Sequence, residues 1–236
     1  MLYNKRFRNE WKFRCDQRTR ISLYERLRPA LNFDEHSGPD GSYAVHSLYF
    51  DDLTDSCARE NEAGTEPRAK YRVRCYGADR AMLHLERKEK NYGLTRKLSC
   101  PLEQSVYMEL IAGNAPDVYW NAENDLLRRF CLAVMNRGFR PKLSLSYQRA
   151  ALIEPALNVR VTFDSAIQAA DAGYGFPTPE GSPVFPLIPE SETIVEVKFD
   201  DILPGWLHKI IESVRMQWVP FSKYYLGRKK LEEIYR

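Results

Sequence analysis

The chain has 236 residues, of which 44% are hydrophobic and 28% charged, so it is long enough to bury a core and its composition argues against intrinsic disorder. The 35 basic and 32 acidic residues leave a formal charge of only +3, so bulk charge does not indicate a polyanionic partner and any strong positive field must be local. Five cysteines without a C-x-x-C pair argue against a disulfide framework or a zinc site and favour a reducing compartment.

Alternation, helical periodicity and turn residues divide the chain into strands and helices. In chain order they predict a strand at 3–15, a helix at 16–31, strands at 43–50, 68–77, 80–90 and 93–99, helices at 102–112 and 122–136, strands at 141–151, 157–166 and 192–199, and helices at 204–216 and from about 223. Asp16 can cap the first helix, Gly138 can end the third, and Gly77-Ala78-Asp79 can turn a hairpin. The stretches 51–67 and 173–189 are predicted as loops.

About eight strands joined by short connections predict an α+β fold with an antiparallel sheet, in a single domain over residues 1–236. Closing the sheet would remove its edge strands, and eight strands leave room for side chains or one small ligand. We therefore expect a closed eight-stranded barrel with charged residues inside and helices packed on the outside. The expected cover consists of the helices at 16–31, 103–112, 122–136 and 204–216.

Charged residues, mostly basic, recur at every second position on five separate strand-like segments. They are Arg8/Glu10/Lys12, Lys70/Arg72/Arg74, Glu86/Lys88/Lys90, Tyr147/Arg149 and Glu196/Lys198. Successive side chains of a strand point to opposite faces, so each set lies on one face of its strand. A solvated sheet face is the ordinary explanation for any one strand, but such a face usually mixes Thr, Ser, Gln, Lys and Glu. The joint pattern favours one cation-lined binding surface.

Eight segments in the same order resemble the VTC domain, the polyphosphate polymerase module of the vacuolar transporter chaperone complex, which belongs to the triphosphate tunnel metalloenzyme (CYTH-like) superfamily. The segments are RNEWKF at 8–13, HSLYFDD at 46–52, KYRVRCYG at 70–77, LERKEK at 85–90, PKLSLSYQRAAL at 141–152, VRVTFD at 159–164, IVEVKF at 194–199 and FSKYYLG at 221–227. The resemblance covers essentially the whole chain and implies a tunnel that holds phosphates.

The resemblance also implies roles for individual residues. Those expected to act on the phosphates during catalysis are Lys12, Arg72, Arg74, Lys88, Arg149, Arg160 and Lys223, and those expected to bind phosphate are Lys90, Lys97, Tyr147, Lys198 and Ser222. Arginine can grip two phosphate oxygens at once and lysine acts as a point charge, so this mixed lining suits phosphates at varied angles. Ten of these side chains are basic; minus the three acids Glu10, Glu86 and Glu196 they give +7, which would leave −4 for the rest of the chain.

The three acids are the predicted metal ligands. Glu196 matches the metal-binding carboxylate of the family, and for Glu10 and Glu86 metal binding and ion pairing with neighbouring cations stay equal alternatives. Mg²⁺ or Mn²⁺ is typically held by one or two carboxylates plus substrate phosphates, so Mn²⁺ or Mg²⁺ is the expected cofactor.

One departure from the superfamily bears on the reaction. Its hydrolytic members begin with Glu-x-Glu-x-Lys, whereas this chain has Arg8 at the first acidic position, which weakens a two-metal, water-activating site. The leading hypothesis is a metal-dependent polyphosphate polymerase that transfers the γ-phosphate of ATP to a growing chain. The alternatives are a tripolyphosphate or nucleoside-triphosphate hydrolase on the same fold, and a non-catalytic polyphosphate sensor.

The expected partners are ATP and inorganic polyphosphate. The chain lacks a P-loop motif and resembles no nucleic-acid-binding module, so no nucleic-acid partner is expected. No apolar run approaches the roughly 18 residues that can span a bilayer, and we expect a cytoplasmic protein. A membrane-protein partner that holds it at the inner face of a membrane, and the oligomeric state, stay open.

Overall fold

The computed structural model describes residues 6–77 and 79–236, so the first residues of the strand predicted at 3–15 and Ala78 of the predicted hairpin lie outside it. Its strands are β1 (Asn9–Asp16), β2 (Asn32–Phe33), β3 (Ser42–Asp51), β4 (Arg68–Tyr76), β5 (Asp79–Asn91), β6 (Leu94–Leu102), β7 (Arg140–Glu154), β8 (Val159–Asp171), β9 (Phe185–Pro186), β10 (Glu192–Phe199) and β11 (Gln217–Trp218). Its helices are α1 (Gln17–Leu27), α2 (Ser56–Glu62), α3 (Gln104–Ala112), α4 (Ala115–Asn121), α5 (Asp125–Arg137), α6 (Gly205–Glu212) and α7 (Lys223–Ile234), with a 3₁₀ turn at Ala172–Tyr174. The predicted α+β class is confirmed.

The predicted closed barrel of eight strands is wrong, because the described residues form an open sheet of 11 strands. Its order is β11-β1-β10-β8-β7-β3-β4-β5-β6, with β2 paired to β7 and β9 to β8. Eight strands are long and the other three have two residues each. Within residues 6–77 and 79–236, the backbones of the long end strands β1 and β6 are joined only by an isolated bridge between Arg8 and Thr95. Closure fails because β11 and Val219 pair with the outer edge of β1 from Lys12 onward.

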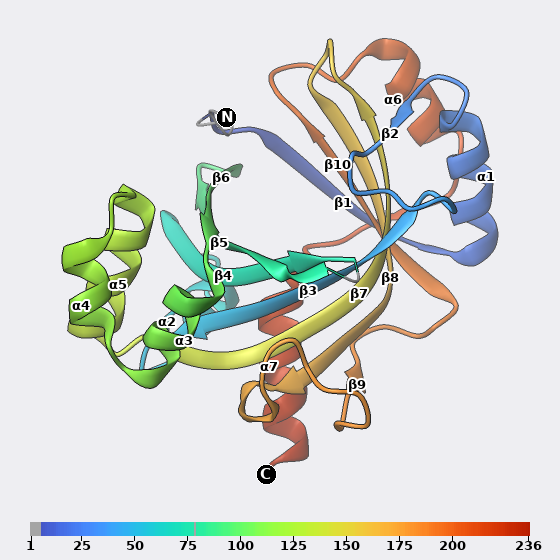
Figure 1. The fold of residues 1–236 in the computed structure, drawn as a ribbon. Helices are drawn as coiled ribbons and strands as arrows, with labels where there is room; N and C mark the ends of the chain where they lie inside the picture. The colour runs from blue at the N-terminus through green and yellow to red at the C-terminus, as the bar shows by residue number, and fades with distance from the viewer. Residues whose placement is uncertain (1–5, 78) are drawn as a thin grey trace.

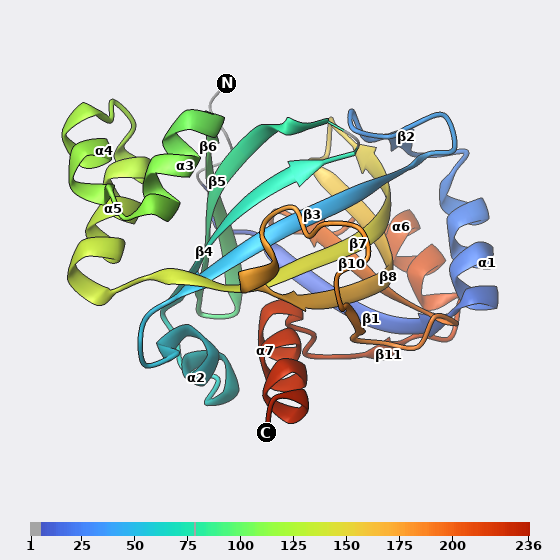
Figure 2. The same ribbon diagram turned by 60° about the horizontal axis from the view of Figure 1, so that its bottom comes forward.

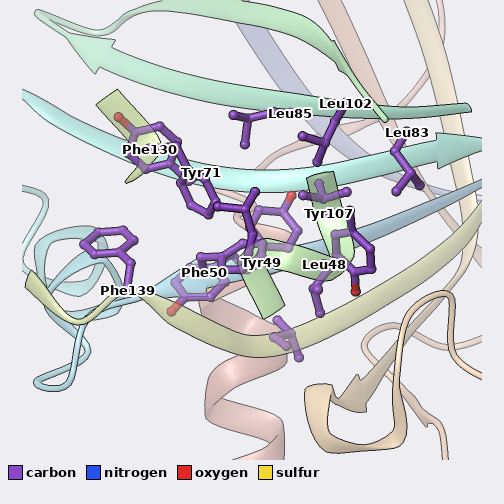
Figure 3. Close-up of a cluster of buried hydrophobic side chains, with 14 of the residues drawn as sticks. Leu48, Tyr49, Phe50, Tyr71, Leu83, Leu85, Leu102, Tyr107, Phe130 and Phe139 are labelled. Carbon is purple, nitrogen blue, oxygen red and sulfur yellow. The ribbon is translucent and has the colours of Figure 1, made fainter. Parts of the chain in front are cut away.

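Helices cover the convex face of the curved sheet at its two ends, as predicted (Figures 1 and 2). At one end α1 and α6 bury Leu23, Leu27 and Leu207 against apolar residues of β7, β8 and β10. At the other end α3–α5 pack on β5 and β6 around the fully buried Phe130, which lies against Tyr71 and Phe50 (Figure 3). Burying these side chains stabilises the fold by about 1.5–3 kcal/mol each.

The C-terminal helix α7 does not join this outer cover. It packs against β7 and β8 on the opposite, concave face, where Tyr224 stacks on Tyr49 with ring centroids 5.3 Å apart. Gly227 permits the close approach, because a Cβ at this position would lie 2.7 Å from Leu143 Cδ2. The predicted outer cover of four helices did not include α7, which instead reaches the face that carries the charges.

Two helices in the described chain, α2 and α4, were not predicted. Helix α2 lies within the stretch 51–67, where the Asp51 carboxylate accepts hydrogen bonds from the backbone N–H groups of Cys57 and Ala58. These bonds satisfy the free donors of the helix start, so a polar segment folds into a helix. The predicted caps of the other helices are confirmed, since Asp16 accepts from the Thr19 N–H at 2.7 Å and Gly138 ends α5 with φ +66°.

Candidate functional site

Register shows that the charged side chains share one face of the sheet. Residues that face each other across two strands point to the same side, and Lys12 pairs with Glu196, Glu196 with Thr162 and Lys198 with Arg160. On the other half of the sheet the facing pairs are Tyr49↔Arg72, Arg72↔Glu86, Lys70↔Lys88 and Lys88↔Lys97. All of these positions lie on the concave face, opposite the helices that cover the two ends.

The predicted metal ligands Glu10 and Glu196 lie in one group of ion pairs at the β1–β10 pair. Glu10 contacts Lys12 at 3.1 Å, Lys88 at 2.7 Å and Lys198 at 3.7 Å. Glu196 contacts the same Lys12 at 3.6 Å and Lys198 at 3.4 Å, and Lys223 of α7 at 3.1 Å. Two shared lysines therefore bring the two carboxylates together, although they come from different strands.

The third predicted metal ligand, Glu86, lies in a separate group at the β4–β5–β6 end of the same face. It is almost fully buried and contacts Arg72 at 2.6 Å, Lys97 at 2.8 Å and Arg74 at 3.7 Å. These contacts are ion pairs with neighbouring cations, which the sequence analysis gave as the alternative to metal binding for Glu86. Arg74 is itself held by Ser47 Oγ at 2.9 Å, which fixes the direction of its guanidinium group.

Asp164 of β8 is a site residue that the sequence analysis missed. Its fully buried carboxylate accepts two hydrogen bonds from Arg149, at 2.6 and 2.7 Å, and one from Lys223 at 2.6 Å. The signal was present, because Asp164 follows Arg160 and Thr162 at every second position of the VRVTFD segment. Counting Asp164 lowers the positive charge of the predicted set by one.

Tyr147 connects the two groups of ion pairs. The Tyr147 hydroxyl accepts a hydrogen bond from Arg74 at 3.0 Å, and the Tyr147 ring lies 4.9 Å from Lys223 Nζ and 5.2 Å from the Arg149 guanidinium. Such contacts with the ring face attract cations. Tyr147 therefore lies in the middle of a connected set of charged side chains that runs from β6 to β10, and its role in binding phosphate stays a prediction.

The carboxylates of the site are held in the ionised form. Burial alone would raise the pKa of Glu10, but Lys88, Lys12 and Lys198 outweigh it and hold that pKa well below its usual range. Burial likewise opposes ionisation of Glu196, and Lys223 and Lys12 again hold its pKa well below the usual value. The acids of the concave face are therefore negative counterions and not proton donors at neutral pH.

The lysines of the site differ in their proton affinity. Burial disfavours the charged form of Lys223, but Asp164 and Glu196 outweigh it and raise its pKa. Burial lowers the pKa of Lys88 to about 8 despite the attraction of Glu10. Lys70 has a pKa of about 7, because it is buried, lies near Lys88, and donates its hydrogen bonds only to neutral oxygens of Asn61 and Ser222. In the free protein, Lys70 and Lys88 therefore lose their protons at a much lower pH than Lys223 does.

The remaining predicted residues lie nearer the ends of the face. Arg160 donates to the Tyr43 hydroxyl at 2.9 Å and pairs with Asp34 at 3.1 Å. Lys90 pairs with Glu66 at 2.9 Å, outside the two groups of ion pairs. Ser222 is the N-cap of α7 and accepts a hydrogen bond from Lys70, so it reaches the site through the helix that carries Lys223.

Arg8, the residue at the departure from the hydrolase motif, is turned to the rim. Its guanidinium group pairs with Asp200 at 2.8 Å and donates to the backbone carbonyl of Asn158. Its backbone forms the bridge to Thr95 of β6. Arg8 therefore ties the end of β1 to its neighbours.

The donor set fits a metal that is shared with a substrate. Within residues 6–77 and 79–236, no group of three or more His, Cys, Asp and Glu side chains could hold a metal by itself. Glu10 and Glu196, which share two lysines, supply two carboxylates. Mg²⁺ and Mn²⁺ are commonly bound by one or two carboxylates with the remaining ligands from phosphates and water.

The fold and the site together define an α+β protein with a curved antiparallel sheet whose concave face is lined by cations. The family model of the VTC domain matches residues 7–232, so the chain belongs to the VTC domain family and the resemblance seen in its motifs is confirmed.

The chain is also similar in structure to two proteins of Pyrococcus horikoshii OT3. The PH1012 protein is 12% identical with a TM-score of 0.49, covering 93% of this chain and 98% of that one. The PH1819 protein is 12% identical with a TM-score of 0.48, covering 95% of this chain and 98% of that one. A comparison with curated proteins gave no match. In the described part of the chain, no helix is both long enough and apolar enough to cross a membrane.

Proposed function

We propose that this protein is a metal-dependent polyphosphate polymerase, which transfers the γ-phosphate of ATP to a growing polyphosphate chain on the concave face. One observation carries the proposal: in the described residues of the site, eight cations from six strands and α7 share four carboxylates. The cations are Lys12, Arg72, Arg74, Lys88, Lys97, Arg149, Lys198 and Lys223, and the acids are Glu10, Glu86, Asp164 and Glu196.

A surplus of buried and partly buried cations on a concave surface favours a ligand with many negative charges. Each charged group lost water when the sheet folded, and the four acids neutralise only half of the positive charge. A chain of phosphates supplies the missing counterions over the whole length of the face. Membership of the VTC domain family supports the same ligand.

The proposed transfer requires the protein to position the phosphates and to neutralise their charge. Arg74 and Arg149 are held in fixed directions by Ser47 and Asp164, so their planar groups are oriented before the substrate arrives. Lys12 and Lys223 are fully charged and can offset the charge that develops on the transferred phosphoryl group. The terminal phosphate of the chain acts as the nucleophile, so no side chain is required for covalent catalysis.

Glu196 and Glu10 are the residues proposed to hold Mn²⁺ or Mg²⁺, while Glu86 organises Arg72 and Lys97. When bound, the metal would neutralise charge on the phosphates of ATP. Arg8 stands where the hydrolase motif has its first acid, and it pairs with Asp200 at the rim. The start of β1 therefore offers Glu10 without a second acid, which disfavours a water-activating pair of metals. This argues for transfer to phosphate over hydrolysis.

The test is a product assay with purified protein, ATP and Mn²⁺. A polymerase consumes ATP and accumulates a long, acid-labile chain that is visible on a gel stained for polyphosphate. Release of orthophosphate alone would establish the hydrolase instead, and salt-sensitive polyphosphate binding without ATP consumption would establish the sensor. Arg74→Ala and Glu196→Gln should abolish turnover with the fold intact, whereas Arg128→Ala on the exposed face of α5 should leave it unchanged.

A further inference from the structure

A second cationic surface lies at the ends of β4, β5 and β6, mostly on the side of the sheet opposite the concave face, in a cavity of about 520 Å³. Its walls come from the ends of β4, β5 and β6, the segment before β1, and α2 and α5. Five of the described residues that line it are basic and two are acidic: Arg68, Arg87, Lys90, Arg96 and Arg137 against Glu60 and Glu89. Glu66 and Asp52, which pair with Arg68, Lys90 and Arg137, bring the acids to four, so the cavity keeps a positive surplus of one.

The cations at this cavity share their counterions, as those of the concave face do. Arg87 and Arg96 both contact Glu89, at 2.7 and 2.5 Å. Arg68 and Lys90 both contact Glu66, at 3.8 and 2.9 Å. Two carboxylates thus hold four cations, and the side chains of all four are partly exposed, by 12–37%, so that a ligand in the cavity can reach them.

Strand geometry links one edge of this cavity to the concave face. Arg68 lies two residues before Lys70 on β4, and Lys90 lies two residues after Lys88 on β5, so both point to the concave side. Arg87, Glu89 and Arg96 point to the opposite side, and the cavity therefore wraps around the strand ends. A row of cations spaced by about 6.8 Å along each strand leads from the site into the cavity.

We propose that this cavity binds the part of a long polyphosphate chain that extends beyond the concave face. The inference rests on the proposed function, and it adds Arg68, Arg87 and Arg96 as binding residues that act on chain length and not on the transfer step. A polyanion gains one counterion-releasing contact for each additional cation that it reaches, whereas a triphosphate is too short to occupy both surfaces.

Binding of two sodium salts, tripolyphosphate and long-chain polyphosphate, tests the proposal by titration calorimetry at several salt concentrations. The variant Arg87→Gln/Glu89→Gln/Arg96→Gln removes the charges and leaves no buried acid unpaired. It should weaken long-chain binding roughly tenfold and flatten the slope of log affinity against log salt by about two, while tripolyphosphate binding is unchanged. Arg18→Ala/Lys209→Ala, on exposed positions of α1 and α6, is the matched control and should change neither ligand.

Three outcomes would overturn the inference while leaving the proposed function standing: unchanged long-chain binding, an equal loss for both ligands, or equal competition by single-stranded RNA at the same phosphate concentration. Failure of the wild-type protein to bind either salt would instead overturn the proposed function. If the triple variant does not fold, Arg68→Gln provides the second test. Its side chain lies at the rim and donates to the Thr65 carbonyl, so its loss should cost long-chain affinity only.

Discussion

Asp164→Asn tests whether the buried charges of the concave face depend on one another. The substitution keeps the size of the side chain but removes the charge that Arg149 and Lys223 contact at 2.6 Å each. Removing one partner of a buried pair costs about 3–5 kcal/mol. Glu196 remains 3.1 Å from Lys223 and 3.9 Å from Arg149, so part of the attraction persists. We expect a loss of about 3 kcal/mol in the free energy of unfolding.

Urea denaturation at pH 7 measures this loss, and a thermal melt should show a fall of about 6–12 °C for a chain of this size. Asp125→Asn is the control, because its pair with Arg129 is exposed and should contribute less than about 1 kcal/mol. Arg149 and Lys223 hold the pKa of Asp164 below its usual value against the effect of burial. Its stabilisation is therefore present above pH 4 and is lost as the pH falls through the lower folded value.

The difference between wild type and variant should accordingly shrink in acid. A variant within 1 kcal/mol of wild type at neutral pH would refute the reasoning, because it would mean that Arg149 and Lys223 find water or other counterions at no cost. A constant difference from pH 7 to pH 3 would refute the assignment of the effect to charge. Addition of tripolyphosphate should stabilise the variant more than the wild type, since the ligand replaces the missing negative charge.

The remaining predictions concern α7 and Lys70. Gly227→Ala places a methyl group 2.7 Å from Leu143, so the melting temperature should fall by an amount equivalent to about 1–3 kcal/mol; an unchanged melt would show that α7 can shift freely. Tyr224→Phe removes the hydroxyl that donates to Asp51 and should cost about 1–2 kcal/mol in urea denaturation, and no loss would exclude this contact as a stabilising one. Because the folded pKa of Lys70 is about 7, Lys70→Met should raise stability at pH 6, with a gain that shrinks as pH rises toward 10; Lys70→Arg should remove the loss of tripolyphosphate affinity that wild type shows above pH 7, and parallel pH profiles would contradict this.

Most of the charged face could be predicted from alternation alone. The period of two places side chains on a face of each strand without any knowledge of the fold, and the pairs Lys12↔Glu196 and Arg72↔Glu86 confirm that the faces coincide. Asp164 obeys the same rule. It was missed because its segment was interpreted for cations only, although a buried arginine needs a counterion from a neighbouring strand.

The open form of the sheet and the place of α7 could not be predicted in this way. Local pattern shows that β1 is a strand, but it does not show which segment pairs with each of its edges. The pairing of β11 with Phe13 and Arg14 depends on the path of the chain after α6. The docking of α7 depends on a glycine that faces Leu143 across more than 80 residues of sequence, and such a contact appears only in three dimensions.

Arg8 and Thr95 form the one backbone bridge between β1 and β6 in the part of the chain that the structure describes, and this has a consequence for how a polymer could reach the cations. A closed, fully hydrogen-bonded barrel can admit a polymer only by one of the polymer's ends. Where two edge strands are joined by one bridge, separating them breaks few backbone hydrogen bonds, and a polymer could enter sideways along its length. Loading would then be insensitive to whether the polymer's ends are free, and a polyphosphate capped at both termini should bind as fast as an uncapped one.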